Sequence, residues 1–408
     1  MVATGMVARA DDRSGIRILA AAGAIFGGLT ALYYFSTINW SQPFARDATT
    51  LVVGRDFLNF WMYGRAAWTP DPSRFYDPQL YKDALTALLG PDYPGQNWSY
   101  PPSIMLIAAP FGRLPYAAAL VCWTVLGVAV FVCSALHNVG GRMLLVAALL
   151  SPAAVFCLIS GQSALITTAM LLAIFTALDR RPLLAGVLIG TLTLKPQLGL
   201  LLPVMLAASG RWRVFLTAAA TALLIAGATT VLVGPQVWSD FILKGLPVQN
   251  LVLADPERIA TPFYPTIFMN LRGAGASYGL AMAVQACGTA FAIAAVFFAY
   301  RFRGNADRAM LNGLFFACAI CAVPYLLSYD TLALSCCAVI LLGKGALDAR
   351  GQILAKLAYW LPLLQMIFGT FHIPGPALIA PAFAAYLLMR LAPAAASASA
   401  NGRIARES

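Results

Sequence analysis

The sequence predicts an all-α, polytopic membrane protein, and three observations support that prediction. Of its 408 residues, 60% are hydrophobic and only 11% are charged, with a mean hydropathy of +0.77, whereas a soluble domain is about half apolar and a quarter charged. Several apolar runs are long enough to cross the hydrocarbon core, which takes about 20 helical residues. Lysines and arginines also gather in alternate short loops, as is typical of multi-spanning proteins. From the run lengths we expect roughly ten to twelve crossings.

The apolar runs divide into long and short segments. The clearest runs are 16–36, 116–136, 142–158, 162–178, 213–233, 276–300, 309–326, 353–371 and 374–391. Three more runs, 182–194, 197–208 and 330–343, are short for a full span. Residues 103–112 predict a half-helix or re-entrant piece, because Pro101, Pro102 and Pro110 bracket them. Short and broken segments indicate a protein interior or a cavity, since irregular backbone at membrane depth survives only there.

The basic residues predict the orientation of the chain. With residues 1–15 in the cytoplasm and the run at 16–36 kept as a first span rather than a cleaved signal, alternate loops carry the basic side chains. These are Arg142, Arg180, Arg181, Arg211, Arg213, Arg301, Arg303, Arg308, Lys344, Arg350, Lys356 and Arg390. We therefore expect one transmembrane domain over 16–392, a disordered cytoplasmic tail over 393–408, and two long outer loops at 37–102 and 234–275.

The first outer loop contains two predicted amphipathic helices, over 55–68 and 78–89. In the first, Phe57, Phe60 and Trp61 recur with helical spacing and form one apolar face. Asp56 and Asn59 fall on another face. The pattern predicts a helix that lies on the membrane surface with its aromatic side chains toward the lipid.

Composition excludes several classes of function. All eight cysteines lie in apolar segments, which argues against a disulfide framework. Two histidines, His137 and His372, are too few for a histidine-built metal centre, and we expect no metal and no cofactor. No nucleotide-binding fingerprint is present. The net charge of +11 reflects cytoplasmic lysines and arginines rather than a nucleic-acid partner.

The predicted topology brings polar residues of five separate segments to the outer side. These residues are Asp56 and Tyr100 in the first outer loop, Gln162, then Lys195 and Gln197, then Tyr329 and Asp330, and finally His372. Polar groups at membrane depth are energetically unfavourable, so a convergent set indicates a functional site.

Each of these residues also has a simpler interpretation. Asp56 could cap its helix or pair with the neighbouring arginine, and Lys195 could extend its ammonium to the membrane surface. Gln162 could belong to a tight turn, Asp330 could cap the next helix, and His372 could be an interfacial residue. None of these alternatives explains why the five segments share one side of the membrane.

The residue types suit the transfer of a group from a lipid phosphate. Asp56 beside an aromatic slot is a candidate general base, and Lys195 is a candidate point charge for a phosphate. Gln162 and Gln197 could donate hydrogen bonds to that phosphate, and Arg55 or Arg65 could add a bidentate contact. The candidates for binding a sugar or an acceptor are Asp330, Tyr329, Tyr100, Asn59 and His372.

Six stretches of the chain resemble one known family. The stretches RDFLNFWMYGRAAW, FYDPQLY and YPPSIMLIAAPFGRLPY, followed by GQSALITTAMLLA, GTLTLKPQLGLLLPV and PYLLSYDTLAL, are similar to membrane glycosyltransferase family 87 of the GT-C superfamily. The resemblance spans roughly residues 50–335 and implies metal-independent transfer, with inversion, of a sugar from a polyprenyl-phosphate donor. It assigns the acidic catalytic residue to Asp56 and the phosphate-binding segments to Gln162, Lys195 and Gln197.

The late motif departs from the mannosyltransferases of that family. This chain has Tyr329 and Asp330 where those enzymes have histidine nearby, so mannose is not carried over as the sugar. We expect a hexosyltransferase-like enzyme of the bacterial inner membrane that works at its periplasmic face, with both termini in the cytoplasm and a lipid or glycan as acceptor. The competing hypotheses are a non-enzymatic flippase or transporter of lipid-linked sugars and an inactive scaffold of polysaccharide export.

Overall fold

The computed structural model describes residues 2–98, 100–138, 141–255 and 261–392. Over these residues the chain forms helices and two isolated β-bridges, and no β-strand occurs among them. The structure therefore confirms the predicted all-α class. The tail at 393–408, predicted to be disordered, lies outside the described residues.

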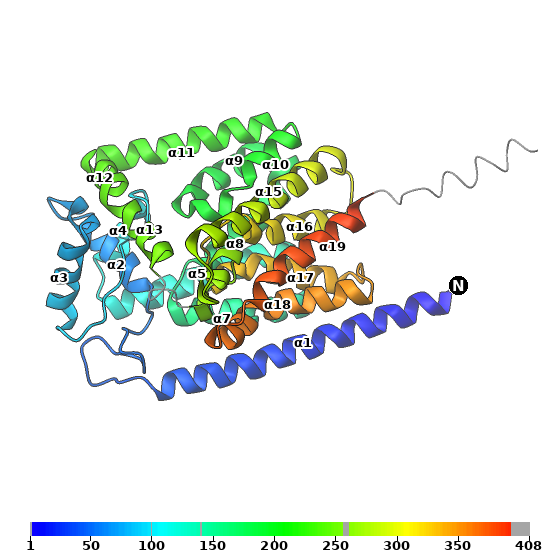
Figure 1. Cartoon of the computed structure of the whole chain (residues 1–408), viewed down its shortest axis with the longest axis horizontal. Coiled ribbons are helices and arrows are strands. Elements are labelled where there is room, and N and C mark those ends of the chain that lie inside the picture. Colours follow the sequence, from blue (N-terminus) through cyan, green and yellow to red (C-terminus); the bar gives the residue numbers. More distant parts are fainter. Residues whose placement is uncertain (1, 99, 139–140, 256–260, 393–408) are drawn as a thin grey trace, which may run out of the picture.

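The α-helices follow one another with short connections except in the two outer loops (Figure 1). They are α1 Val2–Ser36, α2 Phe57–Ala66, α3 Pro78–Leu89, α4 Ile104–Gly112, α5 Tyr116–Asn138, α6 Arg142–Leu149, α7 Pro152–Ser160, α8 Ala164–Arg180, α9 Pro182–Thr191, α10 Leu202–Ala208, α11 Trp212–Val233, α12 Gln236–Asp240, α13 Leu246–Ala254, α14 Ile267–Gly273, α15 Tyr278–Phe302, α16 Arg308–Cys321, α17 Leu332–Gly343, α18 Ala349–Thr370 and α19 Ile379–Leu391. Short helical turns near the site are η2 Leu192–Leu194, η3 Pro196–Gly199 and η7 Ser328–Thr331.

Five helices are long and apolar enough to span a membrane by length and composition, and they lie in α1, α5, α11, α15 and α18. The bent pair α6–α7 would make a sixth, and five further apolar helices are shorter than a full span. The chain is therefore a multi-pass membrane protein. The total of ten to twelve crossings stays a prediction, because it depends on how many of the short helices cross.

The apolar run at 142–158 is not one continuous helix, because the structure divides it into α6 and α7. α6 and α7 meet at an angle of 53°. Pro152 begins α7, and the Ser151 hydroxyl accepts a hydrogen bond from the Ala154 N–H. A proline cannot donate to the preceding turn, so it starts a new helix rather than continuing the old one.

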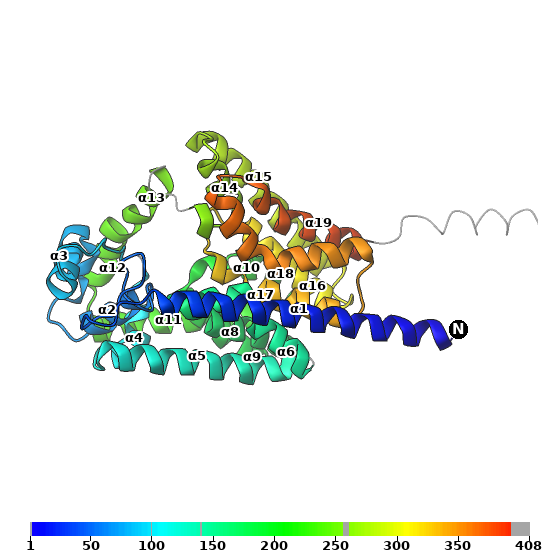
Figure 2. The ribbon, with the colours of Figure 1, turned by 90° about the horizontal axis from the view of Figure 1, so that it is seen from below.

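The helices of the two long loops lie at one end of the molecule in both views (Figures 1 and 2). α2, α3 and α12, which belong to the two long loops, lie together at one end, and the N-terminal end of α1 lies at the other. The start of α11 and the end of α15, which carry basic residues, lie at the same end as the N-terminus. This arrangement separates the long loops from the basic connections, as the sequence predicts.

Burial explains why some apolar helices are shorter than a membrane span. α17 has twelve residues, and ten of them are buried, because α16, α18 and α6 pack around it. α11 is the opposite case, since Leu223, Leu224 and Val231 are 73%, 73% and 83% exposed. A large exposed apolar face is expected of a helix surrounded by lipid, whereas a short central helix needs no lipid contact.

The first outer loop forms its two predicted helices, but the aromatic face of α2 is buried inside the protein. Eight of its ten residues are buried. Its Phe60 ring lies 4.2 Å from the Trp123 ring of α5, and a Cβ placed on Gly64 would come within 2.2 Å of the Ala108 carbonyl of α4. The prediction that its aromatic face meets lipid is therefore wrong, because that face packs on α4 and α5. A periodic pattern identifies a buried face without saying what covers it.

Candidate functional site

Asp56 lies directly before α2, and its side chain faces other parts of the fold. No hydrogen bond links its carboxylate to the start of the helix. Instead, Asp56 Oδ2 accepts hydrogen bonds from Tyr329 Oη at 2.9 Å and from Gln162 Nε2 at 3.2 Å. These partners are distant in sequence, so the simpler interpretation of Asp56 as a helix cap is wrong.

A close approach of α7 to the start of α2 brings Gln162 to Asp56. Gly161 ends α7 in the left-handed conformation, with φ of +59°, which glycine adopts at little cost. A Cβ at this position would lie 2.6 Å from Phe57 Cβ. The Gly161 carbonyl also accepts a hydrogen bond from Trp123 Nε1 at 3.0 Å. The turn thus seats Gln162 against the first outer loop, and the GQ pair acts as a packing element as well as a turn.

The Gln162 amide is oriented by its neighbours. The Ser163 N–H donates to Gln162 Oε1 at 3.2 Å, which leaves the Nε2 donors toward Asp56 and toward Tyr100 Oη, 3.0 Å away. Tyr100 is held in turn, because its backbone N–H donates to Tyr63 Oη at 2.7 Å. The amide of Gln162 therefore faces the carboxylate as a hydrogen-bond donor.

Lys195 and Asp330 form a buried ion pair beside this network. Their Nζ and Oδ1 atoms lie 2.6 Å apart, with side chains only 6% and 2% exposed. Lys195 Nζ also lies 5.2 Å from the centre of the Tyr329 ring, within range of a cation–π contact. Tyr329 therefore connects the ion pair to Asp56. Lys195 does not extend to the surface and Asp330 does not cap α17, so both simpler interpretations are wrong.

The local chain explains how Lys195 comes to point inward. Lys195 lies between η2 and η3, and Pro196 begins η3. Because a proline restricts the preceding residue to extended conformations, α9 and η2 cannot continue through Lys195 as a regular helix. The break between η2 and η3 directs the Lys195 side chain into the protein interior, where it pairs with Asp330 of η7.

The surroundings of Asp56 shift its protonation equilibrium. Burial raises the pKa of the Asp56 carboxyl, while the hydrogen bonds from Gln162 and Tyr329 and the positive charges of Lys195 and Arg55 partly offset that rise. A carboxyl with a raised pKa is a better proton acceptor than an exposed one, once it is ionised.

The remaining predicted site residues have other partners. Arg55, in the left-handed region at φ of +38°, forms an ion pair with Asp47 at 2.6 Å, so it does not pair with Asp56. Asn59 accepts a hydrogen bond from Tyr81. Sequence reasoning missed Asp47, because an ion pair inside an irregular loop follows no periodicity.

Two further candidates stay apart from the network. Gln197 is half-buried, and no hydrogen bond of its side chain is among those found for the described residues. His372 is exposed in a tight turn after α18, with φ of +56°, and only its backbone N–H is bonded, to Gly369. The structure therefore groups Asp56, Tyr100, Gln162, Tyr329 and the Lys195–Asp330 pair, but not these two.

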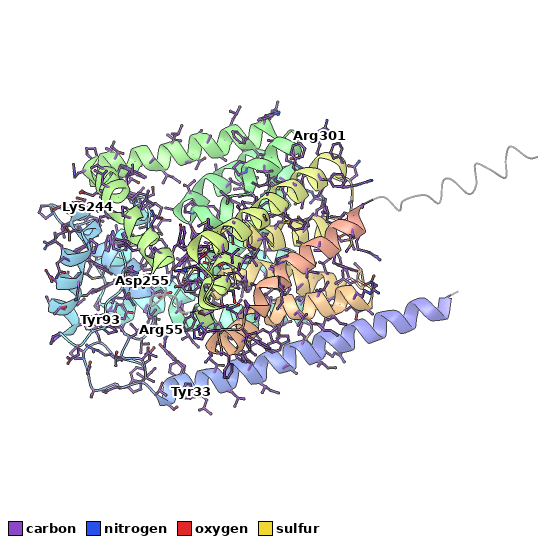
Figure 3. All side chains as sticks on the ribbon, viewed as in Figure 1. Tyr33, Arg55, Tyr93, Lys244, Asp255 and Arg301 are labelled. Carbon is purple, nitrogen blue, oxygen red and sulfur yellow. The ribbon has the colours of Figure 1, made fainter. Side chains whose placement is uncertain are left out.

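The described residues contain no cluster of side chains that could bind a metal ion. Within the described part of the chain, no three His, Cys, Asp or Glu side chains lie close enough together to hold a metal ion. The site is instead built from one half-buried carboxylate, three uncharged hydrogen-bonding side chains and one buried ion pair (Figure 3 labels Arg55 beside it).

The fold and this polar cluster define a multi-pass, helical membrane protein with a hydrogen-bonded polar site around Asp56. A sequence profile of glycosyltransferase family 87 matches residues 98–328, more than half of the chain. The chain therefore belongs to glycosyltransferase family 87, as the resemblance of its motifs predicted. No curated protein and no solved structure compared with the chain matches it.

The matched region contains only part of the polar cluster. Tyr100, Gln162 and Lys195 lie within residues 98–328, whereas Asp56 and Asp330 lie outside them. The case for Asp56 accordingly comes from its contacts with Gln162 and Tyr329 rather than from the matched region.

Proposed function

We propose that the protein is an inverting glycosyltransferase that moves a sugar from a polyprenyl-phosphate donor to a lipid or glycan acceptor. The single observation that best supports this function is the bonding of Asp56 to Gln162 and Tyr329 beside the buried Lys195. Membership of glycosyltransferase family 87 supports the class of reaction. The raised pKa of Asp56 suits removal of the proton from the acceptor hydroxyl. The buried ammonium of Lys195 suits stabilisation of the departing phosphate.

In the proposed reaction, Asp56 accepts the proton of the acceptor hydroxyl. The hydroxyl oxygen then forms a bond to the anomeric carbon of the sugar, and the bond from that carbon to the phosphate oxygen breaks. The bonding electrons leave with the lipid phosphate, and the configuration at the anomeric carbon inverts. One proton moves to Asp56, and one negative charge develops on the leaving phosphate.

Lys195 would stabilise that developing charge. An ammonium group has three N–H donors, and Asp330 takes one of them. The others can contact phosphate oxygens while the pair with Asp330 holds the ammonium in place. Electrostatic stabilisation of a leaving group in a site that excludes water is often the largest catalytic contribution. Asp330 is then a positioning residue for Lys195 rather than a ligand of the sugar, although a sugar contact stays a second proposed role.

The other predicted site residues are assigned to the donor phosphate or to the sugar and acceptor. Gln162, Gln197 and Arg55 would assist in binding the donor phosphate, and Tyr329, Tyr100, Asn59 and His372 would contact sugar or acceptor hydroxyls. We further propose that the reaction needs no metal, and that it takes place at the periplasmic face of the bacterial inner membrane with both termini in the cytoplasm. The clustering of the long loops at the end opposite the basic connections (Figure 1) supports that orientation.

The decisive experiment supplies a panel of radiolabelled polyprenyl-phosphate sugars to the purified protein in lipid. We expect Asp56→Asn to lower transfer by about 10²–10⁴-fold, the usual contribution of a general base, with donor binding retained. Asp83→Asn is the matched control, because Asp83 is an exposed carboxylate of the same loop whose partner is Gln79.

Three outcomes would contradict parts of the proposal. Sugar transfer by the Asp56→Asn variant at the wild-type rate would show that Asp56 is not the general base. Movement of donor across the membrane without any transfer would favour the flippase hypothesis. Loss of transfer in the presence of a metal chelator, restored by a divalent cation, would contradict metal independence.

A further inference from the structure

A cavity lies at the end of the molecule opposite Asp56. Its volume is about 620 Å³, and it is bounded by the end of α15, the turn that leads into α16, and the end of α19. Figure 3 labels Arg301 at this end and Arg55 at the other. The glycosyltransferase mechanism uses no residue of this cavity.

The cavity is basic, because its lining holds more guanidinium groups than carboxylates. Arg301, Arg303 and Arg390 line it together with one carboxylate, that of Asp307. Asp307 is already engaged, because its Oδ2 lies 3.1 Å from Lys344 Nζ and its Oδ1 accepts the N–H of Ala309 at the start of α16. The lining therefore offers three guanidinium groups and no free carboxylate.

Arg303 has an unsatisfied hydrogen-bond donor. Its Nε atom is buried, and it has no hydrogen-bond partner among the described residues. Arg390 is also weakly engaged, since its Nη1 lies 3.5 Å from Asp348 Oδ2. A buried donor without a partner is energetically unfavourable, and the same side chain lines the cavity together with Arg301 and Arg390. Guanidinium groups match the oxygens of a phosphate especially well.

Exposed apolar side chains lie next to this cavity. Phe302 lines it and is 61% exposed, and Met389, which precedes Arg390 in α19 but does not itself line the cavity, is 69% exposed. A free phosphate would use the guanidinium groups alone. A phospholipid would use both features, with its phosphate among the arginines and its acyl chains against the exposed apolar side chains. Basic pockets between membrane helices are known to bind anionic headgroups in this way.

We propose that this cavity is a binding site for the phosphate-bearing headgroup of an anionic membrane phospholipid. The site is separate from the transfer reaction and holds a lipid that is neither donor nor acceptor. Because the cavity lies where the ends of α15 and α19 meet the start of α16, a bound lipid would add a contact among three helices that already pack on one another.

The test uses the purified full-length chain and native mass spectrometry after exchange into phosphatidylglycerol or phosphatidylcholine. We expect phosphatidylglycerol to stay bound and phosphatidylcholine to be lost. Arg303→Gln should weaken phosphatidylglycerol binding roughly fivefold, the effect of one basic residue near an anionic lipid. The double variant Arg301→Gln/Arg390→Gln alters exposed side chains only and should weaken binding more, and it keeps the test valid if Arg303→Gln fails to fold.

Arg350→Gln is the matched control, because Arg350 is an exposed arginine in the first turn of α18 that does not line the cavity. Equal lipid retention by the wild type and the double variant would overturn the proposal. So would an equal loss in Arg350→Gln, which would indicate attraction by net charge alone. Displacement of the lipid by excess inorganic phosphate would overturn it in favour of a free-anion site.

Discussion

Two sets of ionic contacts in this molecule differ sharply in burial. The Lys195–Asp330 pair has side chains 6% and 2% exposed. Asp179, at the end of α8, pairs with Arg211 and Arg308 at 2.6 Å each, but those side chains are 39%, 27% and 67% exposed. Coulombic attraction between exposed groups is screened by water and ions, whereas a buried pair is hardly screened and each partner depends on the other. Equal distances therefore imply very different energetic roles.

The largest effect is expected at the buried pair. Asp330→Asn should lower the free energy of unfolding by about 3–5 kcal/mol, because it leaves the Lys195 ammonium buried without its counter-ion. Denaturant unfolding of the purified protein measures this change. The double variant Lys195→Met/Asp330→Leu should recover most of the stability, since an apolar pair of similar volume can replace a buried ion pair.

The same double variant separates stability from function. It should remain inactive in sugar transfer although it is folded, because no cation is left beside the leaving phosphate. Wild-type transfer by the folded double variant would show that the pair is structural only. An unfolding free energy as low as that of Asp330→Asn would show that the pair cannot be replaced by apolar packing.

The next effect concerns the hydrogen bonds to Asp56. Tyr329→Phe removes one of the two donors that lower the pKa of the Asp56 carboxyl, so that pKa should rise further. A general base is lost as the pH falls through its pKa, and the acid limb of the transfer rate should therefore move to higher pH. Activity at the acidic end should fall about tenfold, since a hydrogen bond to a charged group contributes about 1.5–3 kcal/mol.

Tyr81→Phe is the control for this measurement, because it removes a buried hydroxyl that bonds Asn59 instead. Its pH profile should match that of the wild type. An unmoved acid limb in Tyr329→Phe, with a moved limb in Tyr81→Phe, would transfer the positioning role from Tyr329 to the aromatic cluster around Asn59.

A smaller effect is expected at the exposed pair. Asp179→Asn should change the free energy of unfolding by no more than about 1 kcal/mol, because all three charges can be hydrated when the contact is lost. The difference from the wild type should shrink in high salt. A loss as large as that of Asp330→Asn would show that burial does not distinguish the two sets.

The smallest effect is expected at His372. His372→Ala removes an exposed side chain and should change the free energy of unfolding by no more than about 0.5 kcal/mol. Transfer at saturating acceptor should also change little, because the structure does not join this residue to Asp56. A large rise in the acceptor KM would instead support the acceptor-binding role that its outer-side position suggested.

Much of the fold followed from the sequence, because composition and run length respond directly to the membrane. The apolar runs predicted the long helices, the turn residues predicted α3, and the bracketing prolines predicted the short α4. The break between α6 and α7 was missed, although Ser151 and Pro152 carried the signal for it. Within so apolar a stretch, hydropathy outweighed the local helix-start pattern.

The candidate site was predictable only as a set of segments. Residue type and the predicted side of the membrane identified Asp56, Gln162, Lys195, Tyr329 and Asp330 as candidates. They did not predict which of these residues contact one another. Asp330 was expected to contact sugar, and the structure shows it bonded to Lys195. Arg55 was expected to bind phosphate, and the structure shows it bonded to Asp47. Such contacts join segments that are far apart in the chain or lie in irregular loops, where no periodicity applies.

The stretch around Asp56 shows most clearly which properties follow from the sequence and which follow from the tertiary structure. The sequence by itself determined that a helix lies within 55–68, has one aromatic face and carries a carboxylate near its start, because these properties depend on the spacing of neighbouring residues; the structure bounds this helix as Phe57–Ala66. Only the tertiary structure decided that the aromatic face packs on α4 and α5 and that Asp56 meets Gln162 and Tyr329. Local spacing defines which side chains share a face, whereas the partner of that face depends on how distant helices close around it.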